Sequence, residues 1–233
     1  VASRFAVSFL SATPGLDVAG EVFTLGEAEK TPDQPIGKRL HAHKPATLLG
    51  ATDRPDLECK LVDTARSFVA SHRTIAVVVN RVGSARTVAK NLREVVGEAA
   101  DVVLLTGRMR PLDRDDVGRG LRPRVQTGWR KQASVTKPVV VVGTQCIEAG
   151  ADFGFDALAT ECASLDALRQ RFGRVDRLGD YGKAEAAVVF DKSKAKQADP
   201  VYGESASATW KWLDGQLSGR RRTIDFGVAH LEL

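Results

Sequence analysis

The chain has 233 residues, 43% of them hydrophobic, and its 34 basic side chains against 29 acidic ones give a formal net charge of +5. This composition allows one good core with extensions, and no apolar run approaches the roughly 20 residues that a membrane-spanning helix needs. Three cysteines without metal-ligand spacing argue against a disulfide framework and favour a reducing cytoplasm.

The N-terminal quarter contains one apolar run and one polar segment. The run Phe5–Leu10 leads into Ser11-Ala12-Thr13, and the segment Gly26–Ala42 is polar and interrupted by prolines. Such a segment is typical of a connection between folded units. Two histidines separated by one residue, His41 and His43, lie in a basic stretch. Such histidines are more often solvated than bound to a metal, so the sequence predicts no metal site.

From residue 57 onward, segments with helical periodicity alternate with short apolar segments. The periodicity predicts helices over Leu57–Ser71 and Ser84–Val96. Apolar and β-branched runs predict five strands, which are Thr74–Val79, Asp101–Leu105, Val139–Val142, Phe155–Thr160 and Ala186–Phe190. The alternation predicts an α/β fold with a parallel sheet flanked by helices.

Between the second and third of these strands the positive charge is concentrated. Residues 108–131 hold eight Arg or Lys against three Asp, with several glycines and the single aromatic residue Trp129. A loop of this kind suits single-stranded nucleic acid, whose phosphates need cations and whose bases can stack. A disordered, soluble insertion is the alternative, and Trp129 could equally cover part of the core.

The strand Val139–Val142 runs directly into a polar motif. After Gly143 the chain continues as Thr144-Gln145-Cys146-Ile147-Glu148-Ala149-Gly150-Ala151-Asp152. Ligands of open α/β sheets bind just past the carboxyl ends of the strands. There Thr144 offers a hydroxyl and an N–H to a nucleic-acid phosphate, and Asp152 offers an acceptor to a ribose hydroxyl. An ordinary turn that contains an Asp is the alternative.

Ser164 is placed to cap a helix that we predict to reach Arg177. At about 100° per residue, Gln170, Arg174 and Arg177 fall on one side of this helix, and apolar residues fall on the other. Neighbouring arginines that are partly buried repel each other unless a multiply charged anion lies between them, so this face predicts a polyphosphate site. A solvated, arginine-rich helix end is the alternative.

The C-terminal part gives weaker signals. The segment Asp191–Asp199 is charged and loop-like, and beyond it lie Trp210, Trp212 and the run Arg220-Arg221-Arg222. No role for these residues follows from the sequence, and we treat residues 193–233 as an extension.

In chain order these segments resemble the motifs of superfamily 2 helicases. The matching segments are Ser11-Ala12-Thr13 for motif III, the strand ending in Asn80-Arg81 for motif IV, residues 144–152 for motif V and Gln170–Arg177 for motif VI. Leu104-Leu105-Thr106-Gly107-Arg108, with Pro111, Asp113 and Arg114, resembles the motif that contacts the nucleic-acid backbone. The forms T-Q-x-I-E, Q-R-x-G-R and L-L-x-x-R-x-x-P-x-D-R are similar to the nuclease-helicase of type I CRISPR interference, which is recruited to Cascade.

The resemblance implies a RecA-like lobe two with fixed roles for its residues. Residues 1–25 would be the tail of lobe one, 26–56 the inter-lobe connection, 57–192 lobe two and 193–233 a C-terminal extension. Arg174 and Arg177 would be catalytic arginine fingers, with Gln170 positioning phosphate or the attacking water. The other implied roles are ATP binding by Asp152 and Gly150, nucleic-acid binding by Thr144, Thr106, Arg108, Arg114 and Asn80, and coupling by Ser11 and Thr13.

ATP hydrolysis by such a motor needs a G-x-x-x-x-G-K-[ST] loop and an acidic strand end that holds Mg²⁺. The sequence contains neither, and it begins with Val1, so we expect a piece of a longer helicase. ATP and Mg²⁺ would be bound in the full-length parent and not stably by this chain. The expected partners are single-stranded DNA, the missing N-terminal RecA-like lobe with a nuclease domain, and a Cascade-type complex, with no membrane. An RNA helicase lobe and a non-catalytic docking module are the alternatives.

Overall fold

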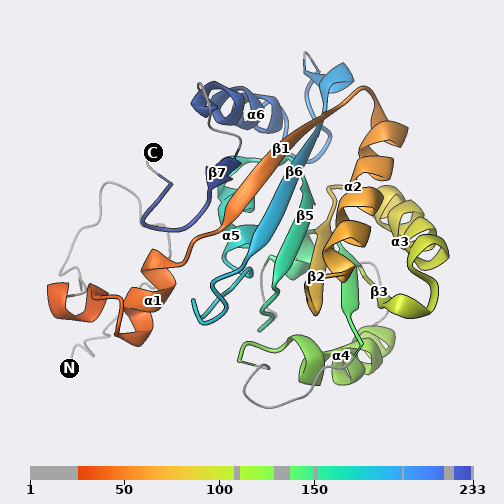
Figure 1. Cartoon of the computed structure of the whole chain (residues 1–233). Coiled ribbons are helices and arrows are strands. Elements are labelled where there is room, and N and C mark those ends of the chain that lie inside the picture. The colour runs from red at the N-terminus through yellow and green to blue at the C-terminus, as the bar shows by residue number, and fades with distance from the viewer. Residues whose placement is uncertain are drawn as a thin grey trace, which may run out of the picture.

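The computed structural model describes residues 26–107, 111–128, 137–148, 152–195, 197–217 and 223–231, and of residues 111–116 only the backbone. The strands are β1 (Pro45–Ala51), β2 (Thr74–Val78), β3 (Asp101–Leu105), β4 (Val139–Gly143), β5 (Ala157–Glu161), β6 (Glu185–Asp191) and β7 (Thr223–Asp225). They form one sheet in the order β3-β4-β2-β5-β6-β1-β7 (Figure 1). Neighbouring strands are parallel, except that β7 is antiparallel to β1.

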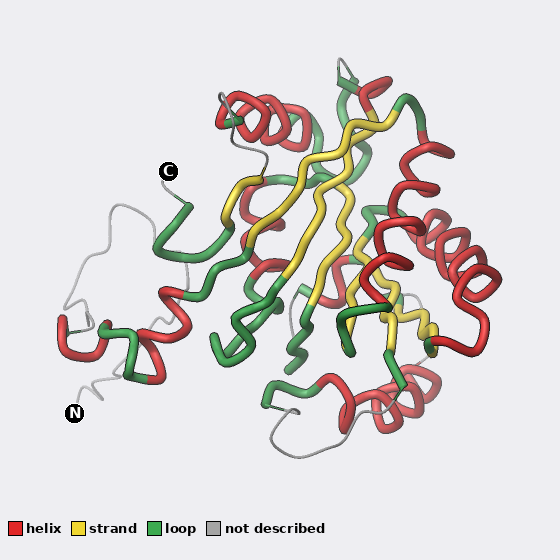
Figure 2. The backbone as a smooth tube through the Cα atoms, viewed as in Figure 1, coloured by secondary structure: helices red, strands yellow, loops and turns green. Residues whose placement is uncertain are grey.

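Helices cover both faces of this sheet (Figure 2). They are α1 (Pro35–His41), α2 (Arg54–Val69), α3 (Val82–Val96), α4 (Pro111–Val125), α5 (Leu165–Phe172) and α6 (Ser205–Gln216), with short 3-10 turns at η1 (Glu27–Lys30), η2 (Gly97–Ala99), η4 (Gln145–Ile147) and η5 (Lys192–Lys194). α2 and α3 pack on one face, and α4, α5 and α6 pack on the other. None of the helices in the described ranges is long and apolar enough to cross a membrane. The predicted α/β class is confirmed.

The five predicted strands are present, with ends shifted by at most two residues. Every residue of β2, β4 and β5 is buried. Strands covered by helices on both faces read as continuous apolar runs, which explains why these three were easy to recognise.

The predicted helices are also present, with different starts. α2 begins at Arg54, three residues before its predicted start, because the Asp53 side chain caps it by accepting from Asp56 N and Pro55 fits the first turn. α3 ends at Val96, and the next residue, Gly97, has a φ of 49° that suits a residue without a side chain.

The prediction of a loop throughout the basic segment is wrong, because residues 111–125 form α4. Leu121 and Val125 are buried, and Val117 packs against the same core cluster. These positions repeat every four residues, so they form an apolar stripe on one side of a helix. Burial of this stripe outweighs the low helix propensity of the segment's glycines and of Pro123.

The sheet also extends beyond residues 57–192, the range predicted for this lobe. β1 lies within the segment predicted to be a connection, and β7 lies in the predicted C-terminal extension. Both lie at one side of the sheet, where β1 is only partly buried and Thr47 is exposed. A half-covered strand lacks the continuous apolar run of a central one, so its sequence signal is weaker.

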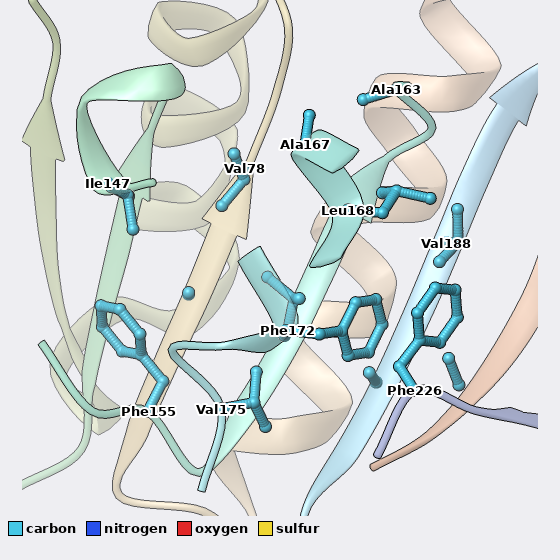
Figure 3. Packing of buried hydrophobic residues seen from close by; sticks show 14 of the residues in the cluster. Val78, Ile147, Phe155, Ala163, Ala167, Leu168, Phe172, Val175, Val188 and Phe226 are labelled. Atoms are coloured by element: carbon cyan, nitrogen blue, oxygen red, sulfur yellow. The ribbon is translucent and has the colours of Figure 1, made fainter. Parts of the chain in front are cut away.

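The C-terminal part belongs to the same core as the strands. Trp210 of α6 is buried and stacks on Phe190 of β6, with ring centroids 5.1 Å apart. Phe226, just after β7, stacks on Phe172 of α5 (Figure 3), with ring centroids 3.9 Å apart. These contacts give Trp210 a packing role that the sequence did not reveal.

The three cysteines are free thiols. Cys59 is exposed, whereas Cys162 is buried, and burial raises the pKa of its thiol to about 12. Packing and hydrogen bonding therefore stabilise the fold without a covalent cross-link among these residues.

Candidate functional site

Several predicted site residues follow strands that end at one edge of the sheet. Leu105 and Val78 both pair with Gly143, so β2, β3 and β4 end at the same level. Asn80, Thr106 and Thr144 therefore gather at this carboxyl edge. A side chain at Gly143 would bring its Cβ to 2.8 Å from the Leu105 carbonyl oxygen, so the close approach of β3 requires glycine here.

Arg171 is the centre of this edge, although the sequence predicted no role for it. Its side chain is fully buried, and all five of its N–H groups have acceptors. The acceptors are Glu148 Oε1 at 2.8 Å, Thr160 Oγ1 at 2.8 Å, Glu161 O at 2.8 Å, Asn80 Oδ1 at 3.1 Å and Tyr202 Oη at 3.0 Å. One guanidinium thus joins segments that resemble motifs IV, V and VI to the C-terminal extension.

Glu148 connects this buried network to Arg174. Its side chain accepts from Arg171, and Tyr202 Oη lies 3.3 Å from the same oxygen, Oε1. Its main-chain carbonyl accepts from Arg174 Nη2 at 2.7 Å and from Nε at 3.3 Å. Because both side chain and main chain of Glu148 are held, the Arg174 guanidinium is positioned from within the core.

The prediction that Arg174 and Arg177 lie on a continuous helix is wrong. α5 ends at Phe172, and the chain then pairs with the segment before β5 through a bridge between Val175 and Phe155. The reversal places Asp176 at a φ of 38°, which Asp tolerates better than most residues. The predicted Ser164 cap is confirmed, since its side chain accepts from Ala167 N.

The two arginines nevertheless lie close together and beside Asp152. Arg177 Nη1 pairs with Asp152 Oδ1 at 2.8 Å, and Arg39 of α1 donates to the Arg177 carbonyl at 2.9 Å. Burial lowers the pKa of Arg174, the charge of Arg177 lowers it further, and Asp152 opposes the shift. The exposed Asp152 carboxylate therefore pairs with Arg177 and also acts electrostatically on Arg174.

The remaining predicted site residues differ in their exposure, and several lie outside the described part of the chain. Gln170 is exposed near the end of α5. Thr106 and Thr144 are buried at the carboxyl edge, with 5% and 4% of their surface exposed. Gly150, Arg108, Ser11 and Thr13 lie outside the described residues, as do Trp129 and Arg220–Arg222, and the side chain of Arg114 is not described.

Asn80 does not fit the predicted contact with nucleic acid. It is buried, its Nδ2 donates to Cys162 O at 2.8 Å, and its Oδ1 accepts from Arg171. Both polar atoms of the side chain are thus used within the protein, and its position supports a structural role.

Arg171, Glu148 and Tyr202 belong to the site but were not predicted from the sequence. A signal for Arg171 existed, because it lies three and four residues after the buried Leu168 and Ala167 and so falls on the buried side of α5. An arginine on the apolar side of a helix predicts a buried acceptor set. Nothing in the local sequence pointed to Tyr202, which lies 31 residues from Arg171.

The fold and the motif order together indicate a class of protein. A parallel sheet covered by helices on both faces, with motif-like segments at its carboxyl edge and after α5, resembles the second RecA-like lobe of superfamily 2 helicases. The crystal structure of T. fusca Cas3 with AMPPNP has the same fold, with a TM-score of 0.54 and 21% identity over 72% of this chain and 20% of that chain.

Comparisons of the sequence identify the family that this lobe resembles. Residues 71–180 match the family model described as CRISPR-associated nuclease/helicase Cas3, C-terminal. The CRISPR-associated helicase Cas3 of Thermoproteus tenax is 40% identical over 145 residues, which are 61% of this chain and 22% of that relative. The CRISPR-associated nuclease/helicase Cas3 of Haloferax volcanii is 27% identical over 203 residues, 85% of this chain and 20% of that relative.

This chain spans about a fifth of the length of these curated relatives. It is similar to the C-terminal helicase part of CRISPR-associated nuclease/helicases, which confirms the resemblance inferred from its motifs.

Proposed function

We propose that this chain is the second motor lobe of an ATP-dependent DNA helicase of type I CRISPR interference. The observation that carries the proposal is the pair of neighbouring arginines, with Arg174 held by the Glu148 carbonyl and Arg177 held by Asp152. Guanidiniums of this kind bind phosphate oxygens with directed hydrogen bonds. The alternative, a solvated helix end, does not predict that Arg174 is held by a residue of a buried hydrogen-bond network.

In the complete protein, a first RecA-like lobe would bind ATP and Mg²⁺, and this lobe would close over the nucleotide. Arg174 and Arg177 would then contact the γ-phosphate, and Gln170 would position phosphate or the attacking water. Asp152, with Gly150, would contact the ribose, and Ser11 and Thr13 would couple the state of the nucleotide to movement of the strand.

We propose single-stranded DNA as the second ligand, bound along the carboxyl edge and α4. Thr106, Thr144, Arg108 and Arg114 are the proposed contacts. Asn80 is left out of this set because both polar atoms of its side chain are hydrogen-bonded within the protein. The names of the relatives support a nuclease domain in the same protein, and the CRISPR association in those names supports a Cascade-type complex as partner.

The first test is ATP hydrolysis by the chain alone. We expect essentially no turnover and weak ATP binding, with or without DNA, because the sequence contains no phosphate loop. A full-length protein that contains this lobe should hydrolyse ATP when single-stranded DNA is added. DNA-stimulated turnover by the purified 233-residue chain, surviving removal of contaminating ATPases, would contradict the proposal.

The second test is the salt dependence of DNA binding. Arg122 is exposed on α4, so Arg122→Gln should weaken single-strand binding and flatten the slope of log K against log [salt] by roughly 0.7 if it contacts one phosphate. The matched control is Arg86→Gln, which removes an exposed cation from α3 on the opposite face of the sheet. Equal slopes for the two variants would exclude α4 from the DNA path.

Arg124 belongs to the same basic segment as Arg122, but its substitution is not a suitable test of DNA binding. It pairs with Asp101 at 2.7 Å and donates to the Lys137 carbonyl at 2.9 Å, so it ties α4 to β3 and β4. Hydrogen bonds from Lys137 and then from Arg124 lower the pKa of Asp101. Removal of Arg124 would therefore change the fold as well as the charge.

A further inference from the structure

Three side chains that could bind a metal ion meet where the segment before β1 lies beside the segment that follows β7. His43 precedes β1, Asp225 ends β7, and His230 follows it. Their ligand atoms all lie within 4.8 Å of one another. His43 Nδ1 is 2.6 Å from Asp225 Oδ2, and the rings of His43 and His230 are stacked at 4.0 Å with an angle of 14° between them.

The carboxylate of this group is held by the backbone. Asp225 Oδ1 accepts from Lys44 N at 2.7 Å and from Gly227 N at 2.8 Å, which leaves Oδ2 directed to His43. Burial raises the pKa of Asp225, but these backbone hydrogen bonds and His43 lower it overall. Fixed outer contacts of this kind orient the ligands of metal sites in proteins.

The three side chains of this group offer the kinds of ligand atom that a transition metal ion binds. A divalent cation is bound by neutral imidazoles and by carboxylate oxygen. Ligand atoms about 2.1 Å from a tetrahedral ion lie about 3.4 Å apart, so binding would draw the three side chains together and tilt the two rings out of their stack.

We propose that His43, Asp225 and His230 form a binding site for a first-row transition metal ion, with Zn²⁺ as the preferred occupant. The donor set of two imidazoles and one carboxylate fits zinc and its neighbours better than Ca²⁺ or Mg²⁺, which prefer oxygen. The sequence alone predicted no metal here, because Asp225 lies 182 residues after His43.

Such a site would fasten the C-terminal segment to the lobe. β7 has three residues and lies at the edge of the sheet, where it pairs with β1 alone. Phe226, next to Asp225, stacks on Phe172 at the end of α5. A bound ion would therefore stabilise the region that carries the turn to Arg174, by binding to the folded state and not to the unfolded one.

The test uses the 233-residue chain, freed of metal by chelation and dialysis. We expect one Zn²⁺ to bind per chain by calorimetry, and a roughly 100-fold excess over Kd to raise the Tm by about 5 °C or more. Co²⁺ as a probe should give visible absorption bands typical of a site with nitrogen ligands. His43→Ala and His230→Ala should each weaken Zn²⁺ binding at least about tenfold and remove the Tm rise.

His41→Ala is the matched control, because His41 lies two residues from His43 while its ring is hydrogen-bonded to Lys30 O, outside the cluster. It should bind Zn²⁺ as the parent chain does. Circular dichroism of each variant will separate loss of the site from loss of the fold. The Co²⁺ spectrum of the unsubstituted chain tests the site even if a variant fails to fold. Absence of saturable Zn²⁺ binding, or binding unchanged in both His43→Ala and His230→Ala, would overturn the proposal.

Discussion

Arg174→Ala, introduced into a full-length protein that contains this lobe, is expected to lower the kcat of ATP hydrolysis by at least about 10². The guanidinium would act on charge that develops on the transferred phosphoryl group, so its loss should affect the transition state more than the ground state. We therefore expect the KM for ATP and the affinity for single-stranded DNA to stay within a few-fold of the parent values. Steady-state hydrolysis and equilibrium DNA binding measure these quantities.

Arg169→Ala is the control for this experiment, because Arg169 is an exposed arginine on α5, five residues before Arg174. It should leave kcat unchanged. Arg174→Lys tests the geometry, because it keeps the charge but loses the fork of N–H groups that contacts the Glu148 carbonyl. Wild-type turnover in Arg174→Ala would remove the assignment of this residue as a finger and weaken the proposed function as a whole.

Arg171→Met is expected to destabilise the folded chain strongly. Methionine has a similar length but donates nothing, so Glu148 would lose its buried cation, and Thr160, Asn80 and Tyr202 would each lose a hydrogen bond. Removal of one partner of a buried ion pair costs about 3–5 kcal/mol. Urea unfolding of the chain, followed by tryptophan fluorescence, measures the change in the free energy of unfolding.

Arg169→Met is the matched control, and its effect should stay within about 0.5 kcal/mol because the side chain is exposed. A second comparison uses the double variant Arg171→Met with Glu148→Gln, which removes the uncompensated charge as well. It should recover part of the loss if the ion pair is the cause. A loss below about 1 kcal/mol for Arg171→Met, with an unchanged m-value, would show that the network contributes little to stability.

The candidate site was partly predictable, and the reasons differ from residue to residue. The spacing of Gln170, Arg174 and Arg177 predicted neighbouring, partly buried arginines, and the structure places Arg174 and Arg177 together beside Asp152. Their backbone was predicted wrongly, because a bridge between Val175 and Phe155 competes with continuation of the helix. Helical periodicity describes the side chains of one segment and contains nothing about a neighbouring strand that the segment can join.

The sequence by itself determined the class of fold and the family resemblance. Runs such as Val139–Gly143 are buried on both faces of the sheet. Such a strand needs apolar side chains at every position, so it can be recognised from a short stretch of sequence. The motif residues are likewise close together in the chain, so their order could be recognised without a structure.

Only the tertiary structure decided which distant residues meet. It brought Tyr202 and Asn80 to Arg171, and His230 and Asp225 to His43, and it placed β1 and β7 in the sheet. The physical reason is that local sequence encodes burial and backbone preference, whereas contacts between distant segments depend on strand order and register. These in turn follow from how all the apolar faces are buried at once.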